Sequence, residues 1–390
     1  MTLAVPSDTY RAAAAVPISA PRESGLDALR AVMTLLVLFH HSAITYGASG
    51  AWFYREIGAN ESVNSKLLIA FTAVNQAYFM GLFFLIAGYF TPAAVARHGA
   101  LGFLQDRLLR LGLPLLIFGF VIGPATIALA QTARGRPFWE SLSGLWTRSY
   151  FEPGPLWFVE ALLIFALLFV AWQALASRFF AAEVPASRFP SDRTLLLAAL
   201  ATGAVAFALR LRWPVGTQIF GLQLGYFASY VVLFAAGCLA AEGHLLRDIP
   251  RRQRRLWGRV ALICGPLLFV LLLIGPRVGV LQGRPEGGWN APALIYAFWE
   301  PLVAWGLILA LLHTFQRRFV SLGPGGSALS RRAYLIYIIH PPVLVAVALA
   351  WRDVGAAPLL KFAVTGTVTC LACYVIAGAL MHLPGVRRVV

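Results

Sequence analysis

The segment Gly25-Leu-Asp-Ala-Leu-Arg-Ala-Val-Met-Thr-Leu-Leu-Val-Leu-Phe-His-His41 decides the fold, because it is apolar enough for a membrane helix yet carries Arg30, His40 and His41. At about 100° per residue, His41 lies within about 20° of Arg30 on a helical wheel, whereas His40 points about 80° away. Ionisable side chains at membrane depth are costly and usually functional. The pattern therefore predicts a functional face with Arg30 and His41. The alternative is a histidine that only bonds a neighbouring helix.

The composition places this segment in a polytopic membrane protein. The chain has 390 residues, of which 59% are hydrophobic and 12% charged, about half the charged fraction of a soluble domain. The sequence predicts an all-α fold, a polytopic transmembrane helix bundle of about ten spans. The predicted spans are 26–47, 66–90, 111–130, 156–176, 194–209, 224–241, 259–275, 291–312, 333–351 and 358–382. We expect a membrane domain over 25–383, a disordered cytoplasmic tail over 1–24 and a cytoplasmic tail over 384–390.

The basic residues indicate how the chain is oriented. If the N-terminus is inside, 21 of the 32 Lys and Arg residues fall on inner segments and 11 on outer ones. The positive-inside rule then predicts that both termini are cytoplasmic. The net charge of +16 belongs to these loops, and no nucleic-acid partner is expected. The densest basic cluster, Arg251–Arg255, is interpreted as an anchor on anionic lipid, and a phosphate-binding role is the alternative.

A pair of arginines precedes the third predicted span. Arg107 and Arg110 are three residues apart, so on a helix they place two guanidinium forks on neighbouring faces. Such forks match the oxygens of phosphate or carboxylate groups. Ordinary positive-inside flanking is the other interpretation.

Three more ionisable residues lie inside predicted spans. Glu160 and Glu300 need partners at membrane depth, and each could pair with an arginine or orient an imidazole. His340 is followed by Pro341 and Pro342, which free backbone carbonyl groups upstream, so this histidine could serve as their partner. Both a structural and a functional role remain open for all three.

Four motifs in this order resemble the acyltransferase 3 family. They are Arg30 ten residues before His41, the Phe83-Phe-Leu-Ile-Ala-Gly-Tyr-Phe90 run, the Arg107/Arg110 pair before Pro114, and Tyr334-Leu-Ile-Tyr-Ile-Ile-His-Pro341. The resemblance covers residues 25–382. Within the family, the glucan-modifying branch of glucans biosynthesis protein C is most similar, since no esterase-like domain is expected here.

The resemblance implies a membrane O-acyltransferase. It would move an acyl group, acetyl or succinyl, from cytoplasmic acyl-CoA to a hydroxyl of a glycan or other acceptor, with acyl-CoA as donor substrate and no permanently bound cofactor or metal. By position, His41 corresponds to the catalytic histidine, Arg30 to its arginine partner, and Arg107 with Arg110 to the donor-binding pair. Glu160, Glu300 and His340 are possible supporting residues. The lipid bilayer of a bacterial inner membrane is the expected surrounding. The alternative function is a secondary transporter of a small polar solute.

Overall fold

The computed structural model describes residues 23–179, 188–277, 279 and 281–389. Residues 1–22, most of the predicted N-terminal tail, lie outside the described residues. The elements are α1 (Ser24–Thr45), α2 (Val63–Arg107), the π-helix η1 (Leu108–Gly112), α3 (Leu113–Ile117), the π-helix η2 (Phe118–Ile122), α4 (Gly123–Thr132), α5 (Phe138–Trp146), the 3-10 helix η3 (Gly154–Leu156), α6 (Trp157–Phe179), α7 (Asp192–Arg212), the 3-10 helix η4 (Leu224–Tyr226), α8 (Phe227–Glu242), α9 (Arg251–Ile274), α10 (Ala291–Arg318), α11 (Pro324–Ala350), α12 (Pro358–Leu380) and α13 (Val386–Val389).

The all-α polytopic bundle expected from the sequence is confirmed. Within the described part of the chain, nine helical runs are long and apolar enough to cross a membrane. The longest run, 63–132, has 70 residues and would extend about 105 Å if straight, far more than the roughly 30 Å of a hydrocarbon core. It breaks at Gly99, whose φ of +69° is left-handed. This one run therefore contains both the second and the third predicted spans.

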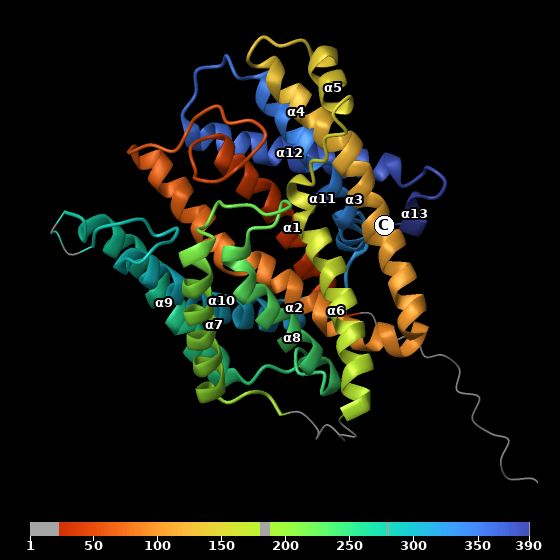
Figure 1. The fold of residues 1–390 in the computed structure, drawn as a ribbon, viewed down its shortest axis with the longest axis vertical. Helices are drawn as coiled ribbons and strands as arrows, with labels where there is room; N and C mark the ends of the chain where they lie inside the picture. The colour runs from red at the N-terminus through yellow and green to blue at the C-terminus, as the bar shows by residue number, and fades with distance from the viewer. Residues whose placement is uncertain (1–22, 180–187, 278, 280, 390) are drawn as a thin grey trace, which may run out of the picture.

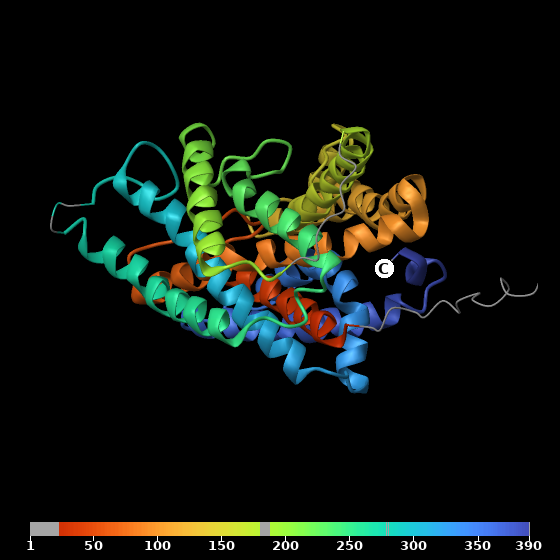
Figure 2. The same cartoon turned by 90° about the horizontal axis from the view of Figure 1, so that it is seen from below.

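Helix α1 lies deep in the bundle. It contacts α2, α10, α11 and α12, and its most apolar stretch is largely buried. Figure 1 shows α7, α9 and α10 grouped at the left of the view and α4, α11 and α12 above and to the right, with α1 and α2 between the groups. The short helix α13 contacts η1, just beyond the end of α2 (Figure 1 and Figure 2). The side chains of α1 are thus presented to both groups of helices.

Glycines allow α2 and α8 to approach closely. A Cβ atom at Gly88 would overlap the carbonyl group of Phe234, and one at Gly237 would overlap the carbonyl group of Leu85. Close backbone approach at small residues is the usual way for membrane helices to associate, because lipid tails supply no hydrophobic driving force between them. The glycine in the 83–90 run therefore serves helix packing.

A buried ion pair joins α7 to α10. The guanidinium group of Arg210 donates to the carboxylate of Glu300, and their side chains are 1% and 4% exposed. Arg210 Nε also donates to the carbonyl oxygen of Gly225, 3.0 Å away, while the rings of Tyr226 and Tyr296 flank the cation. Of the two roles left open for Glu300, the structure shows the pairing with an arginine.

We predict that Glu300→Ala strongly destabilises the protein, because it leaves the Arg210 cation buried without its counter-charge. The loss should be about 3–5 kcal/mol, measured by unfolding in detergent. Glu140→Ala, which removes an exposed carboxylate on α5, is the matched control. The double change Arg210→Met with Glu300→Leu should recover most of the loss, and equal stability of Glu300→Ala and Glu140→Ala would contradict the prediction.

Candidate active site

Two histidines from helices far apart in sequence meet near one end of the bundle. The Nδ1 atom of His41, on α1, lies 3.0 Å from the Nε2 atom of His340, on α11, and the two rings are nearly parallel. His41 is the fifth residue from the end of α1, and His340 is fully buried. The sequence identified both residues as candidates, and the structure brings them into direct contact.

The prolines that follow His340 explain its orientation. Pro341 has no amide hydrogen, so the carbonyl group of Tyr337, four residues earlier, lacks its helical donor. The Nδ1 atom of His340 lies 2.6 Å from that carbonyl oxygen. The hydroxyl group of Tyr337 donates to the carbonyl oxygen of Pro155, in η3. His340 thus satisfies the freed backbone with one ring nitrogen and faces His41 with the other.

This geometry determines where the protons lie when both rings are neutral. A carbonyl oxygen only accepts hydrogen bonds, so the Nδ1 atom of His340 must carry hydrogen and donate to Tyr337. The Nε2 atom of His340 then has a lone pair and accepts from the Nδ1–H group of His41. The Nε2 atom of His41 is consequently unprotonated. It is the nitrogen that can take a proton from a reacting group.

His40 faces a different neighbour, as the helical phase predicts. Its ring stacks against Phe79 of α2, with centroids 5.0 Å apart, and its Nδ1 atom has no hydrogen-bond partner among the described residues. His41 instead stacks against Trp52 at 4.0 Å, with an interplanar angle of 9°. The two adjacent histidines therefore have separate surroundings.

Arg30 lies at the opposite end of α1 from His41. Eleven residues separate them, or about 16 Å along the helix, and Arg30 pairs with Asp27 at 3.6 Å. Its charge interacts with that of Arg107, as does the charge of Arg110. The structure thus brings Arg30 to the arginine pair rather than to the imidazole.

The Arg107/Arg110 pair lies where α2 continues into η1. Arg110 Nε donates to Asp106 at 2.8 Å, and its side chain is 51% exposed. The guanidinium group of Arg107 lies over the ring of Phe103. Tyr334 of α11 donates to the backbone carbonyl of Arg110, at 2.9 Å. Packing and a partial ion pair therefore hold both forks at this end of the bundle, which we call the arginine end.

The two intramembrane carboxylates lie apart from the histidine pair. Glu300 is bound to Arg210, and Glu160 is partly buried, with no hydrogen-bond partner for its Oε2 atom among the described residues. Among the described residues, the hydrogen bonds of His41 and His340 involve neither carboxylate. The side chain that contacts and orients the imidazole of His41 is that of His340.

Trp52 is a site residue that is not among the candidates named from the sequence. It lies in the loop 46–62 and covers one face of both histidine rings, with its ring centroid 5.8 Å from that of His340. The available signal was its place in the loop that follows α1, the helix that carries His41.

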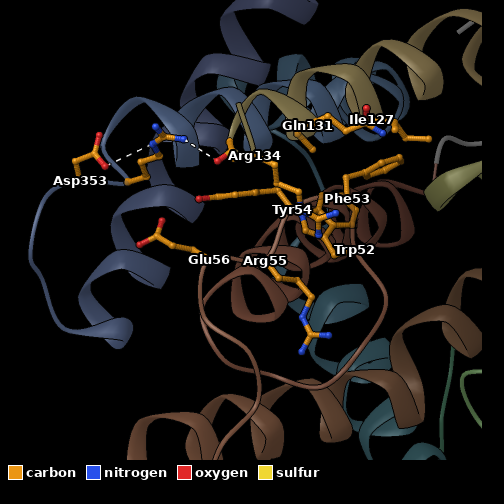
Figure 3. A pocket seen from close by; sticks show the side chains of 12 residues that line it. Trp52, Phe53, Tyr54, Arg55, Glu56, Ile127, Gln131, Arg134 and Asp353 are labelled. Atoms are coloured by element: carbon orange, nitrogen blue, oxygen red, sulfur yellow. Dashed lines mark hydrogen bonds and ion pairs between the residues drawn. The ribbon is translucent and has the colours of Figure 1, made fainter. Parts of the chain in front are cut away.

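Trp52 also lines a cavity of about 580 Å³, which we call the Trp52 cavity. Its walls are residues 52–56 of the loop, five residues between 127 and 134, and Arg352 with Asp353 from the turn after α11. Figure 3 shows these side chains on three segments of the chain, with the guanidinium group of Arg55 directed away from Gln131 and Arg134. The cavity therefore ends at the ring that stacks on His41.

A buried ion pair fixes the loop that carries Trp52. Lys361 of α12 donates to Glu56 at 2.5 Å and to the carbonyl oxygen of Arg352 at 2.9 Å. Ser65 donates to the carbonyl oxygen of Gly47, so the loop is also tied to α2. These contacts hold the aromatic floor of the cavity against the histidine pair. No group of three or more His, Cys, Asp or Glu side chains in the described ranges could hold a metal ion.

The chain belongs to the acyltransferase 3 family. The model of the family's acyltransferase domain matches residues 23–378, nearly the whole chain. The family, and with it an acyltransferase built as a bundle of membrane helices, is thereby established.

Among curated proteins, the chain is similar to glucans biosynthesis protein C of Salmonella paratyphi B and of Salmonella heidelberg. Each is 28% identical over 151 residues, which is 38% of this chain and 38% of the relative. The alignment thus spans little more than a third of either protein. No solved structure matches the chain.

We predict that His41 carries its proton on Nδ1 at neutral pH. Nitrogen NMR of protein labelled with ¹⁵N-histidine should show a protonated Nδ1 and an unprotonated Nε2 for His41, assigned by their loss in His41→Gln. His340→Ala removes the acceptor, so the Nδ1-protonated form should no longer be enforced. An Nε2-protonated His41 in the unmodified protein would contradict the prediction.

Proposed function

We propose that this protein transfers an acyl group from acyl-CoA to a hydroxyl group of its acceptor, with His41 as the general base. The observation that carries the proposal is the hydrogen-bonded chain from Tyr337 through His340 to His41. It leaves a basic nitrogen on His41 beside the floor of the Trp52 cavity. Since a hydroxyl group is a poor nucleophile near neutral pH, a base at this position is what the reaction requires.

The reaction follows from this arrangement. The acceptor hydroxyl attacks the thioester carbonyl carbon while its proton moves to the Nε2 atom of His41. The resulting imidazolium keeps its Nδ1–H bond to His340, whose other nitrogen is held by the Tyr337 carbonyl group. The tetrahedral intermediate then loses the thiolate, which takes the proton back from His41. An ester and free coenzyme A are formed, and the base is regenerated.

The donor would bind at the arginine end. Coenzyme A carries several phosphate charges, and Arg107, Arg110 and Arg30 gather positive charge there. Guanidinium forks bind phosphate oxygens in a bidentate manner. The flexible arm of the donor would then run along α1, over the roughly 16 Å between Arg30 and His41, and deliver the thioester to the histidine pair.

This path gives the protein a direction across the membrane. The distribution of basic residues supports a cytoplasmic location in a bacterial cell, where acyl-CoA is found, for the arginine end and both termini. The Trp52 cavity would then open on the outer face of the inner membrane. The acceptor, a glycan or another hydroxylated molecule, would enter from that side. The relatives' name supports a glucan acceptor, and an acetyl or succinyl group fits the proposal equally well.

We predict that His41→Ala lowers acyl transfer by at least about 100-fold, the usual contribution of general-base catalysis. His40→Ala should retain most of the activity, because His40 faces Phe79 rather than His340. The assay is release of free coenzyme A thiol by purified protein, with the amount of membrane-inserted protein measured for each variant. Equal loss of activity in both variants would rule out the proposed role of the His41 face.

We also predict that Arg107→Ala and Arg110→Ala each raise the acyl-CoA concentration for half-maximal rate about tenfold or more, as expected for a lost charge-assisted bond. Lysine should restore binding only in part, because a point charge cannot replace a bidentate fork. Arg97→Ala, an exposed arginine on α2, is the control. If calorimetry showed unchanged coenzyme A binding to the double alanine variant, the donor site would have to lie elsewhere. Arg251–Arg255 would then be the next candidate.

A further inference from the structure

Some charged side chains of the Trp52 cavity form ion pairs and others do not. Both of its carboxylates are engaged. Glu56 accepts from the buried amine of Lys361 at 2.5 Å, and Asp353 pairs with Arg352 at 3.5 Å. Arg55 and Arg134 also line the cavity, are exposed, and have no carboxylate within 4 Å among the described residues. The cavity therefore offers two guanidinium groups without counter-charges.

These two arginines come from separate parts of the chain. Arg55 follows the aromatic run of the loop 46–62, and Arg134 lies in the turn after α4. The turn is braced from the other side, because Arg352 donates to the carbonyl oxygen of Ala133 at 3.4 Å. Two segments that are both held through contacts of Arg352 thus carry one arginine each at the same cavity (Figure 3).

The rest of the lining suits a ligand with many hydroxyl groups. Trp52, Phe53 and Tyr54 supply aromatic surface for C–H groups, and the amide of Gln131 can donate to and accept from hydroxyl groups. The pKa of Tyr54 is raised, first by burial and then by the charge of Glu56, so its hydroxyl remains a hydrogen-bond donor at neutral pH. A neutral polyol would contact these side chains but would give neither arginine a counter-charge.

We propose that the Trp52 cavity binds an acceptor that combines a polyhydroxylated part with a negatively charged group, a carboxylate or a phosphate. The anionic group would bind at the guanidinium groups of Arg55 and Arg134, and the polyhydroxylated part would lie on the aromatic floor toward His41. This inference rests on the proposed function for the hydroxyl group that reacts. The preference for an anionic ligand rests on the cavity alone and can be tested without turnover.

The test compares three sugars that differ at one carbon: glucose, glucuronate and glucose 6-phosphate. Saturation-transfer NMR titrations with the full-length protein in nanodiscs give each dissociation constant. We expect at least one anionic sugar to bind about tenfold more tightly than glucose, as charge-assisted bonds to arginine allow. The tighter of glucuronate and glucose 6-phosphate identifies the anionic group as carboxylate or phosphate. Added salt should weaken binding of the anionic sugar and leave that of glucose nearly unchanged.

Matched variants assign the preference to the two arginines. Arg55→Gln and Arg134→Gln should each reduce it several-fold, whereas Arg284→Gln, an exposed arginine in the loop after α9, should leave it intact. Equal affinity for glucose and both anionic sugars, no binding of any of the three, or a preference unaffected by both variants would overturn the proposal. The same titration on His41→Ala separates the two hypotheses. If His41→Ala still transfers acyl groups, the proposed function fails, while an intact sugar preference still supports the anion site.

Discussion

The carbonyl group of Tyr337 has lost its helical donor, because Pro341 has no amide hydrogen. In a membrane, a backbone polar group without a partner costs several kcal/mol, since no water can replace the lost bond. His340 provides that bond through Nδ1. Its ring is thereby oriented and its tautomer determined, so that it can only accept at Nε2, from His41. Because Pro341 lacks an amide hydrogen, His340 adopts the tautomer that leaves the Nε2 atom of His41 basic.

The charged side chains of the bundle include two kinds, which are buried ion pairs and the arginines of the arginine end. Arg210 and Glu300 neutralise each other between α7 and α10, and Lys361 with Glu56 does the same beneath the loop 46–62. These buried pairs hold elements in place. Arg107, by contrast, lies close to two like charges at the arginine end. The three arginines of this end outnumber its two paired carboxylates, Asp27 and Asp106, and a surplus of positive charge is what a donor with several phosphates requires.

The sequence was sufficient for the fold, since hydropathy and helix length predict the spans without knowledge of their neighbours. It also separated His40 from His41, because helical phase is a local property. The long run 63–132 differs from the expected pair of separate spans because the residues between the two spans are also helical, with an interruption at the left-handed Gly99.

The site was only partly predictable, because its contacts join distant segments. The partner of His41 is His340, 299 residues away. The prolines after His340 indicated that it could bond backbone, but nothing local showed that its second nitrogen would meet α1. Trp52 was not among the candidates, because a tryptophan near the end of a predicted span fits the membrane interface equally well. The pairing of Glu300 with Arg210 depends in the same way on the packing of α7 against α10.

The central claim is that the donor enters from the cytoplasmic arginine end while His41 acts deeper along α1. Sealed membrane vesicles test it directly, because acyl-CoA does not cross a bilayer. Vesicles that expose the cytoplasmic face and enclose a hydroxylated acceptor should release coenzyme A from added acyl-CoA when they contain the unmodified protein, and His41→Ala vesicles should not. Vesicles of the opposite orientation should be inactive until they are opened. Equal activity in both sealed preparations, or in the opposite orientation alone, would contradict the account.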